Sequence, residues 1–109
     1  MSAALRIKRK LTMKKKIPMN KEEAKIERDC RKLALRNRCI LVKIENNGYS
    51  GIPDDLFISA DGSQVFLIEF KKNDKQHLRK EQKVWFERFP HLCFRCNSIE
   101  DFKKITQLE

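Results

Sequence analysis

The spacing of apolar residues changes along the chain from helical to alternating and back, which predicts a mixed α/β domain. Residues 21–37 form a charged segment with an apolar stripe, so we expect an amphipathic helix with a basic outer face. The residues of that stripe are Ile26, Cys30, Leu33 and Ala34. Residues 39–44 are mostly apolar and predict a strand, which the polar run 45–48 ends.

Two β-rich runs, residues 54–59 and 65–70, flank the dipeptide Asp61-Gly62. Asp-Gly tolerates the positive φ angles of a type I′ turn, so the pattern predicts a β-hairpin. With a two-residue turn at 61 and 62, Asp54 lies directly opposite Glu69, and a four-residue loop over residues 60–63 preserves this register. The hairpin therefore brings two carboxylates together.

A second helix is predicted over residues 75–89 and ends at Pro90. We expect its aromatic residues, Trp85, Phe86 and Phe89, to lie in the core. Residues 92–96 indicate a short strand, and Ser98 with Asp101 resembles a capping box that opens a last short helix. The predicted order is αβββαβα, a mixed sheet with helices packed on it.

Opposed strand residues point to the same face of a sheet, with Cβ atoms about 4.5 to 5.5 Å apart. Lys71 follows Glu69 by two residues and shares that face. Two facing carboxylates in a buried sheet repel each other and lose hydration, which a shared divalent cation would relieve. The alternative is a surface hairpin on which Asp54, Glu69 and Lys71 form an ordinary salt-bridged face.

The formal charge of the chain is +10, and 37% of its 109 residues are charged. Seven basic residues and no acid lie in residues 1–20, which leaves +3 for residues 21–109. We therefore expect a flexible basic tail, residues 1–20, ahead of one folded domain, residues 21–109. Such a distribution favours nucleic acid over membranes or other acidic partners.

The chain lacks an apolar run long enough to cross a bilayer and an apolar signal segment, so a soluble intracellular protein is expected. Four cysteines are then thiols, and they could in principle bind zinc. The spacing of Cys30 and Cys39 matches no usual zinc knuckle, and Cys93 and Cys96 lie in a strand-like run. Buried free cysteines are the preferred interpretation.

Three motifs resemble the virus-type replication-repair nuclease (VRR-NUC) domain, a branch of the PD-(D/E)XK nuclease superfamily. They are Gly51-Ile-Pro-Asp54, Glu69-Phe-Lys71 and Gln82-Lys-Val-Trp85, within a resemblance that covers roughly residues 21–96. The resemblance implies a restriction-endonuclease-like αβββαβ core. It also implies a DNA endonuclease that hydrolyses phosphodiester bonds, possible selectivity for junctions or flaps in replication and repair, and no organic cofactor.

The resemblance further implies Mg²⁺ or Mn²⁺ held by Asp54, Glu69 and the backbone carbonyl of Phe70. Lys71 would orient or deprotonate the attacking water. Gln82 matches a glutamine beside the active site; the alternative is a glutamine hydrogen-bonded within the core. Asp55 departs from the apolar residue usual after the motif aspartate, which leaves open which of the two aspartates is the ligand, although the hairpin pairing favours Asp54.

An acidic residue of the first helix often completes the metal environment in this family. Glu27 fits best by position, with Glu23 one turn earlier as the second choice. Four residues are candidates for DNA contact, with surface charge or packing as the alternative: Tyr49, Lys72, Lys75 and Arg79. Viral and phage members of the family are homodimers, so the resemblance implies a homodimer in the host cytoplasm or nucleoid if the source is viral.

Two other functions stay open. One is a catalytically inactive nuclease-like accessory protein that only binds DNA, although the intact set of Asp54, Glu69 and Lys71 argues against it. The other is a basic protein-interaction module, which would bind nucleic acid no more tightly than its charge explains.

Overall fold

The computed structural model describes residues 18–45 and 48–109. The predicted basic tail therefore lies almost wholly outside the described residues. The order of elements matches the sequence prediction: α2 (Lys21–Arg36), β1 (Ile40–Lys43), β2 (Asp55–Ile58), β3 (Val65–Phe70), α3 (Lys80–Arg88), β4 (Cys93–Cys96) and α4 (Ile99–Thr106). No helix in these two ranges is long and apolar enough to cross a membrane.

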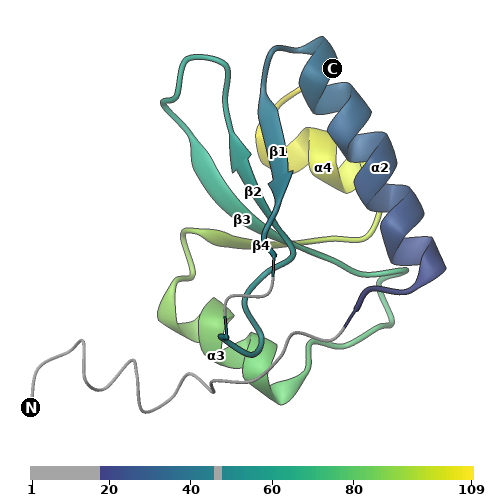
Figure 1. Ribbon diagram of the computed structural model, residues 1–109, viewed down its shortest axis with the longest axis vertical. Coiled ribbons are helices and arrows are strands. Elements are labelled where there is room, and N and C mark those ends of the chain that lie inside the picture. Colours follow the sequence, from purple (N-terminus) through teal and green to yellow (C-terminus); the bar gives the residue numbers. More distant parts are fainter. Residues whose placement is uncertain (1–17, 46–47) are drawn as a thin grey trace, which may run out of the picture.

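The sheet has the strand order β1-β2-β3-β4. The first three strands are antiparallel, whereas β4 runs parallel to β3 and is reached through α3. Figure 1 shows α2 and α4 together on one side of this sheet and α3 apart from them, near β4. The fold is thus the mixed αβββαβ core that was predicted, followed by one further helix.

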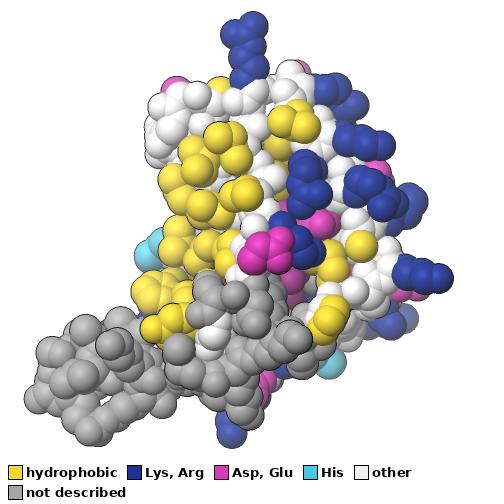
Figure 2. All heavy atoms as spheres, in the orientation of Figure 1, with side chains coloured by type: hydrophobic (Ala, Val, Ile, Leu, Met, Phe, Trp, Pro, Cys, Tyr) yellow, Lys and Arg dark blue, Asp and Glu magenta, His cyan; other side chains and the backbone are white. Residues whose placement is uncertain are grey.

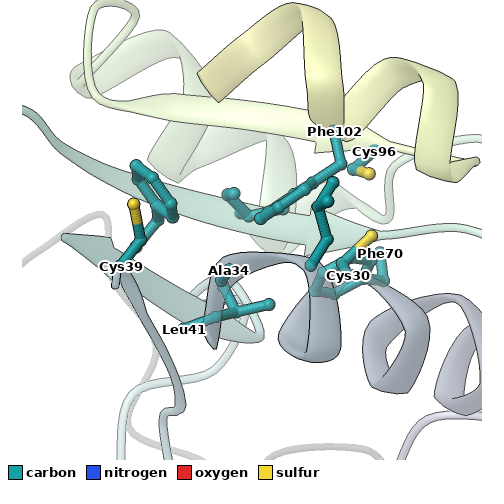
Figure 3. Packing of buried hydrophobic residues seen from close by; sticks show 10 residues of the cluster. Cys30, Ala34, Cys39, Leu41, Phe70, Cys96 and Phe102 are labelled. Atoms are coloured by element: carbon teal, nitrogen blue, oxygen red, sulfur yellow. The ribbon is translucent and has the colours of Figure 1, made fainter. Parts of the chain in front are cut away.

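The two faces of the sheet carry different residues and have different surroundings. The core face carries Phe57, Ile68 and Phe70 and is covered by α2 and α4. The opposite face, called the site face below, carries Leu56, Leu67 and Glu69, because alternate residues of a strand point to opposite sides. Figure 3 shows the core as a cluster of small and aromatic side chains between the sheet and the helices, including Cys30, Ala34, Cys39, Leu41, Phe70, Cys96 and Phe102.

All four cysteines are free and buried, as predicted. Cys30 and Cys96 touch within the core, and this contact together with burial raises the pKa of the Cys30 thiol far above its usual range. Cys93 lies on the site face beneath α3, where burial raises its pKa to about 11. The Cys93-x-x-Cys96 pair is therefore divided between the two faces of the sheet.

The predicted hairpin register is confirmed. Asp55 pairs with Ile68 and Ile58 pairs with Val65, so one further step along both strands places Asp54 opposite Glu69. The turn itself differs from the type I′ prediction, because among the described residues other than glycine only Arg38 and Gln107 have positive φ. The loop is the four-residue alternative, closed by a hydrogen bond from Ser59 N to Gln64 O of 2.9 Å.

The Asp61 side chain explains why the two-residue turn does not form. Its Oδ1 accepts hydrogen bonds from the Ser63 backbone N–H, the Ser63 hydroxyl and the Ser59 hydroxyl, at 3.0, 2.7 and 2.9 Å. Such local bonds favour a wider turn that keeps Asp61 at negative φ, while Gly62 takes the left-handed conformation at φ +75°. These hydrogen bonds, led by those from Ser63, lower the pKa of Asp61 to about 2.

The second helix is shorter than predicted, because α3 begins at Lys80 and not at residue 75. Asn73 Oδ1 accepts hydrogen bonds from the backbone N–H groups of Lys75 and Gln76, and this turn competes with helix formation. The prediction that Trp85, Phe86 and Phe89 lie in the core is wrong. They are half-buried on the site-face side and stay outside the core cluster, and Gln82 is the buried residue of α3.

Candidate active site

Four predicted site residues meet at one end of the site face. Asp54 precedes β2, Glu69 and Lys71 lie at the end of β3, and Gln82 belongs to the first turn of α3. Their exposed fractions are 6, 3, 1 and 5%, so this is not the solvated surface hairpin of the alternative interpretation. Burying so many polar groups costs free energy unless each finds a partner or a ligand.

Gln82 connects the two charged residues of β3. Its Nε2 donates to Glu69 Oε2 at 2.8 Å, and its Oε1 accepts from Lys71 Nζ at 2.8 Å. The Lys71 ammonium also lies 3.7 Å from Glu69 Oε2. The backbone N–H of Arg79 donates to Gln82 Oε1 at 2.7 Å, so the amide group is held on both sides. Glu69 and Lys71 are thereby fixed relative to each other.

Asp54 is oriented by the neighbouring strand. The Phe70 backbone N–H donates to Asp54 Oδ2 at 2.8 Å. The N–H and C=O of one strand residue point the same way, so the Phe70 carbonyl also leaves β3 on the side of Asp54. A pocket beside Asp54 opens between the loop before β2 and the first turn of α3; its lining residues are Ser50, Gly51, Ile52, Asp54, Arg79, Glu81 and Gln82.

This donor set fits a magnesium or manganese ion. Two carboxylates, Asp54 and Glu69, occupy opposed positions, and a backbone carbonyl is directed to the same side. Such hard oxygen donors suit Mg²⁺, which commonly uses one or two protein carboxylates and keeps several waters. Within residues 18–45 and 48–109, no three His, Cys, Asp or Glu side chains are grouped so that they could hold a metal ion.

Glu27 and Asp55 form a separate group at the core face. Arg31 Nη2 lies 3.3 Å from Asp55 Oδ2 and 3.3 Å from Glu27 Oε1, and Lys43 Nζ lies 3.4 Å from Glu27 Oε2. Burial and then the hydrogen bond to Glu27 raise the pKa of Asp55 to about 9. Burial alone would raise the pKa of Glu27, but its hydrogen bond with Asp55 and the charges of Lys43 and Arg31 hold it below its usual value.

This Glu27–Asp55 pair was not anticipated from the sequence. If both carboxyl groups are ionised, Asp55 Oδ1 is buried without a hydrogen-bond partner among the described atoms. A proton shared between Asp55 and Glu27 would give it a partner. The sequence feature that could have indicated this pair is the position of Asp55 directly after Asp54. Successive residues of a strand point to opposite faces, so Asp55 lies on the other face of the sheet from Asp54. The structure therefore places Glu27 with Asp55, and Asp54 with Glu69.

Replacing Asp55 by asparagine should flatten the pH dependence of stability. A carboxyl whose pKa rises on folding stabilises the fold fully below its unfolded pKa, and this contribution is lost as pH rises through about 9. Between pH 5 and pH 8, the wild-type free energy of unfolding should therefore fall relative to that of Asp55→Asn, by up to about 4 kcal/mol. Urea unfolding at both values measures this, and a variant that loses stability equally at both would contradict the shared proton.

Glu23 ties the segment after β3 to the first helix. Its Oε2 accepts from Gln76 Nε2 at 2.6 Å, and Gln76 Oε1 accepts from the Lys72 backbone N–H at 2.7 Å. Glu23 also completes the capping box of α2 with Asn20. Its side chain is engaged in holding the connection between β3 and α3.

The candidate DNA-contacting residues lie around the same end of the molecule. Lys72 and Lys75 are exposed on the connection between β3 and α3, and Arg79 lines the pocket beside Asp54. Tyr49 is half-buried and packs edge-on against Trp85, with ring centroids 6.4 Å apart. Lys72, Lys75 and Arg79 thus all lie on the connection between β3 and α3.

Comparison with solved structures identifies one relevant similarity. A structure described as a VRR_NUC domain superimposes with a TM-score of 0.70 at 22% sequence identity, covering 81% of this chain and 97% of that one. No protein-family model and no curated protein matches the sequence. The chain therefore has the fold of a VRR_NUC domain, with a restriction-endonuclease-like αβββαβ core.

Proposed function

We propose that this protein is a metal-dependent DNA endonuclease that hydrolyses phosphodiester bonds. The observation that carries the proposal is the burial of Asp54, Glu69 and Lys71 at one end of the site face, where Gln82 bridges Glu69 and Lys71. A fold that only bound DNA would gain nothing from burying two acids and an ammonium group, whereas a cation site with adjacent proton-transfer groups requires them.

Asp54 and Glu69, with the Phe70 carbonyl, would hold Mg²⁺ or Mn²⁺. When bound, the ion supplies a Lewis acid for the scissile phosphate and lowers the pKa of water. The Lys71 ammonium group is held beside Glu69 because it donates a hydrogen bond to Gln82 Oε1. From there it would orient the attacking water and stabilise negative charge on the phosphate. Glu27, which is held by Asp55 and Lys43 at the core face, is not proposed as a ligand of this ion.

DNA is the proposed substrate, approached through the basic segment after β3. Lys72 and Lys75 would neutralise backbone phosphates, and Arg79 would contact the phosphate next to the pocket. Tyr49, which packs against Trp85 of α3, would contact the DNA from the loop before β2. Junctions and flaps are the preferred substrates proposed, in keeping with replication or repair.

A cleavage panel tests this proposal. The purified protein is incubated with labelled plain duplex, flap and four-way junction DNA in Mg²⁺, Mn²⁺ or EDTA. We expect cutting with either ion, none in EDTA, and faster cutting of the branched forms. Tight binding to all substrates without cutting by any would favour the inactive accessory protein. Binding that only follows salt concentration would indicate a basic interaction module.

We propose a homodimer as the active form, and an exposed apolar area on the site face supports this. Ile40 and Val65 flank Ile58 on that face, and Val42 lies beside them; Ile40, Val42 and Val65 are 52, 47 and 42% exposed. Figure 2 shows hydrophobic side chains gathered between the β2–β3 hairpin and α3.

Light scattering should give twice the 13.0 kDa chain mass for the wild-type protein, and Val42→Lys should return the monomer mass. A wild-type monomer at high concentration would exclude the dimer.

A further inference from the structure

Gly51 lies where the loop before β2 meets the first turn of α3. Its φ of +81° favours glycine, and an added Cβ would overlap the carbonyl group of Glu81 and lie 2.8 Å from the backbone nitrogen of Gln82. The atoms it would meet belong to backbone, which cannot turn aside as a flexible side chain can. The backbone of α3 is therefore as close to this loop as a residue without a side chain permits.

The same loop holds α3 at a second point one turn further along. Trp85 Nε1 donates to the carbonyl oxygen of Ser50 at 3.2 Å, and the Trp85 and Tyr49 rings form a T-shaped contact. Ser50 and Gly51 thus contact successive turns of α3 on the side that faces the pocket. Together they fix both the distance and the rotation of the helix relative to the start of β2.

The first turn of α3 is also the turn that supplies Gln82. A glutamine side chain reaches Glu69 and Lys71 through hydrogen bonds of 2.8 Å each, and such bonds weaken steeply beyond about 3.2 Å. Displacing the helix backbone by about 1 Å would break or distort both, and misplacement of this size can lower a rate about 100-fold.

We propose that Gly51 is a positioning residue for the candidate active site. Its missing side chain lets α3 dock closely enough for Gln82 to bridge Glu69 and Lys71, so that the ammonium group of Lys71 is held in place. Gly51 itself touches neither the proposed ion nor the reacting atoms. The predicted loss of DNA cleavage rests on the proposed nuclease function. The predicted displacement of Gln82 does not depend on it.

Gly62 offers a matched control. It has nearly the same backbone conformation, at φ +75°, but an added Cβ there has no heavy atom within 4 Å. Gly51→Ala and Gly62→Ala therefore introduce similar backbone strain, and only the first pushes on α3. We expect Gly51→Ala to lower kcat for DNA cleavage by about 30- to 100-fold with little change in KM, and Gly62→Ala to change kcat by less than about threefold.

The second readout is the side-chain amide signal of Gln82 in ¹⁵N-resolved NMR spectra, recorded on the full chain without DNA. Its two protons should differ in shift and exchange slowly in wild type and Gly62→Ala, but resemble free amide protons in Gly51→Ala. A Gly51→Ala protein that keeps this signal and cuts like Gly62→Ala would overturn the proposal. Wild-type protein that cuts no DNA would remove the nuclease function, while the amide signal would still decide the positioning role.

Trp85→Phe covers the case in which Gly51→Ala does not fold. It removes the indole donor to Ser50 and adds no volume. We expect a threefold to tenfold fall in kcat with KM unchanged, together with faster exchange of the Gln82 amide protons. Wild-type values for both quantities would show that the contact between the loop and α3 does not position Gln82.

Discussion

Asp54→Asn is expected to abolish DNA cleavage, lowering kcat by a factor of about 10³ or more, while the protein keeps its fold. Asparagine has nearly the same shape, and its Oδ1 still accepts a hydrogen bond from the Phe70 N–H in place of Asp54 Oδ2. What is lost is the negative charge opposite Glu69, and with it most of the attraction for a divalent ion. Single-turnover cleavage at saturating Mg²⁺ measures the effect, with circular dichroism to confirm the fold.

Asp55→Asn is the control for this experiment, because the two aspartates are neighbours in sequence on opposite faces of the sheet. Asp55 is fully buried beside Arg31 and Glu27, away from Glu69. Cleavage by Asp55→Asn should stay within about tenfold of wild type. If Asp55→Asn were inactive and Asp54→Asn active, the metal ligand would be Asp55 and not Asp54, which would contradict the proposed site.

Lys71→Met should lower kcat by a factor of about 10³ without weakening metal binding. Methionine fills a similar volume, so the 1%-exposed site stays packed, but the donor to Gln82 and the positive charge 3.7 Å from Glu69 are lost. Removing that positive charge makes the carboxylates a stronger site for a cation. Calorimetric titration with Mn²⁺ should therefore give an affinity equal to or higher than that of wild type.

Lys72→Met is the matched variant, one residue later and exposed. It should weaken DNA binding slightly and reduce its salt dependence, with kcat nearly unchanged. If Lys71→Met lost activity only because Mn²⁺ no longer bound, Lys71 would be a structural support for the carboxylates and not a participant in the reaction.

The relative position of the candidate active-site carboxylates could be predicted, because it depends only on the number of residues between each of them and the centre of the hairpin turn. Once the centre of the hairpin lay between residues 61 and 62, the register of every pair followed, including Asp54 with Glu69. The turn type could not be predicted in the same way. It depends on which side-chain hydrogen bonds Asp61 forms, and three of them favour the longer loop.

The environment of the first helix was harder to predict. Helical spacing shows which residues of α2 share a face, but not which strand residue that face meets. Glu27 was therefore expected near the metal ligands, whereas the packing of α2 on the core face places it beside Asp55 and Lys43. Likewise, the apolar residues of α3 indicated burial, but β4 and the loop at Ser50 cover only part of them.

The most direct test of the account is a crystal structure grown with Mn²⁺, using the anomalous signal of manganese to locate the ion. We predict a peak in contact with a carboxylate oxygen of Asp54, one of Glu69 and the Phe70 carbonyl, and its loss in Asp54→Asn. A peak held by Glu27 and Asp55 at the core face, or no peak near Glu69 at saturating Mn²⁺, would contradict it.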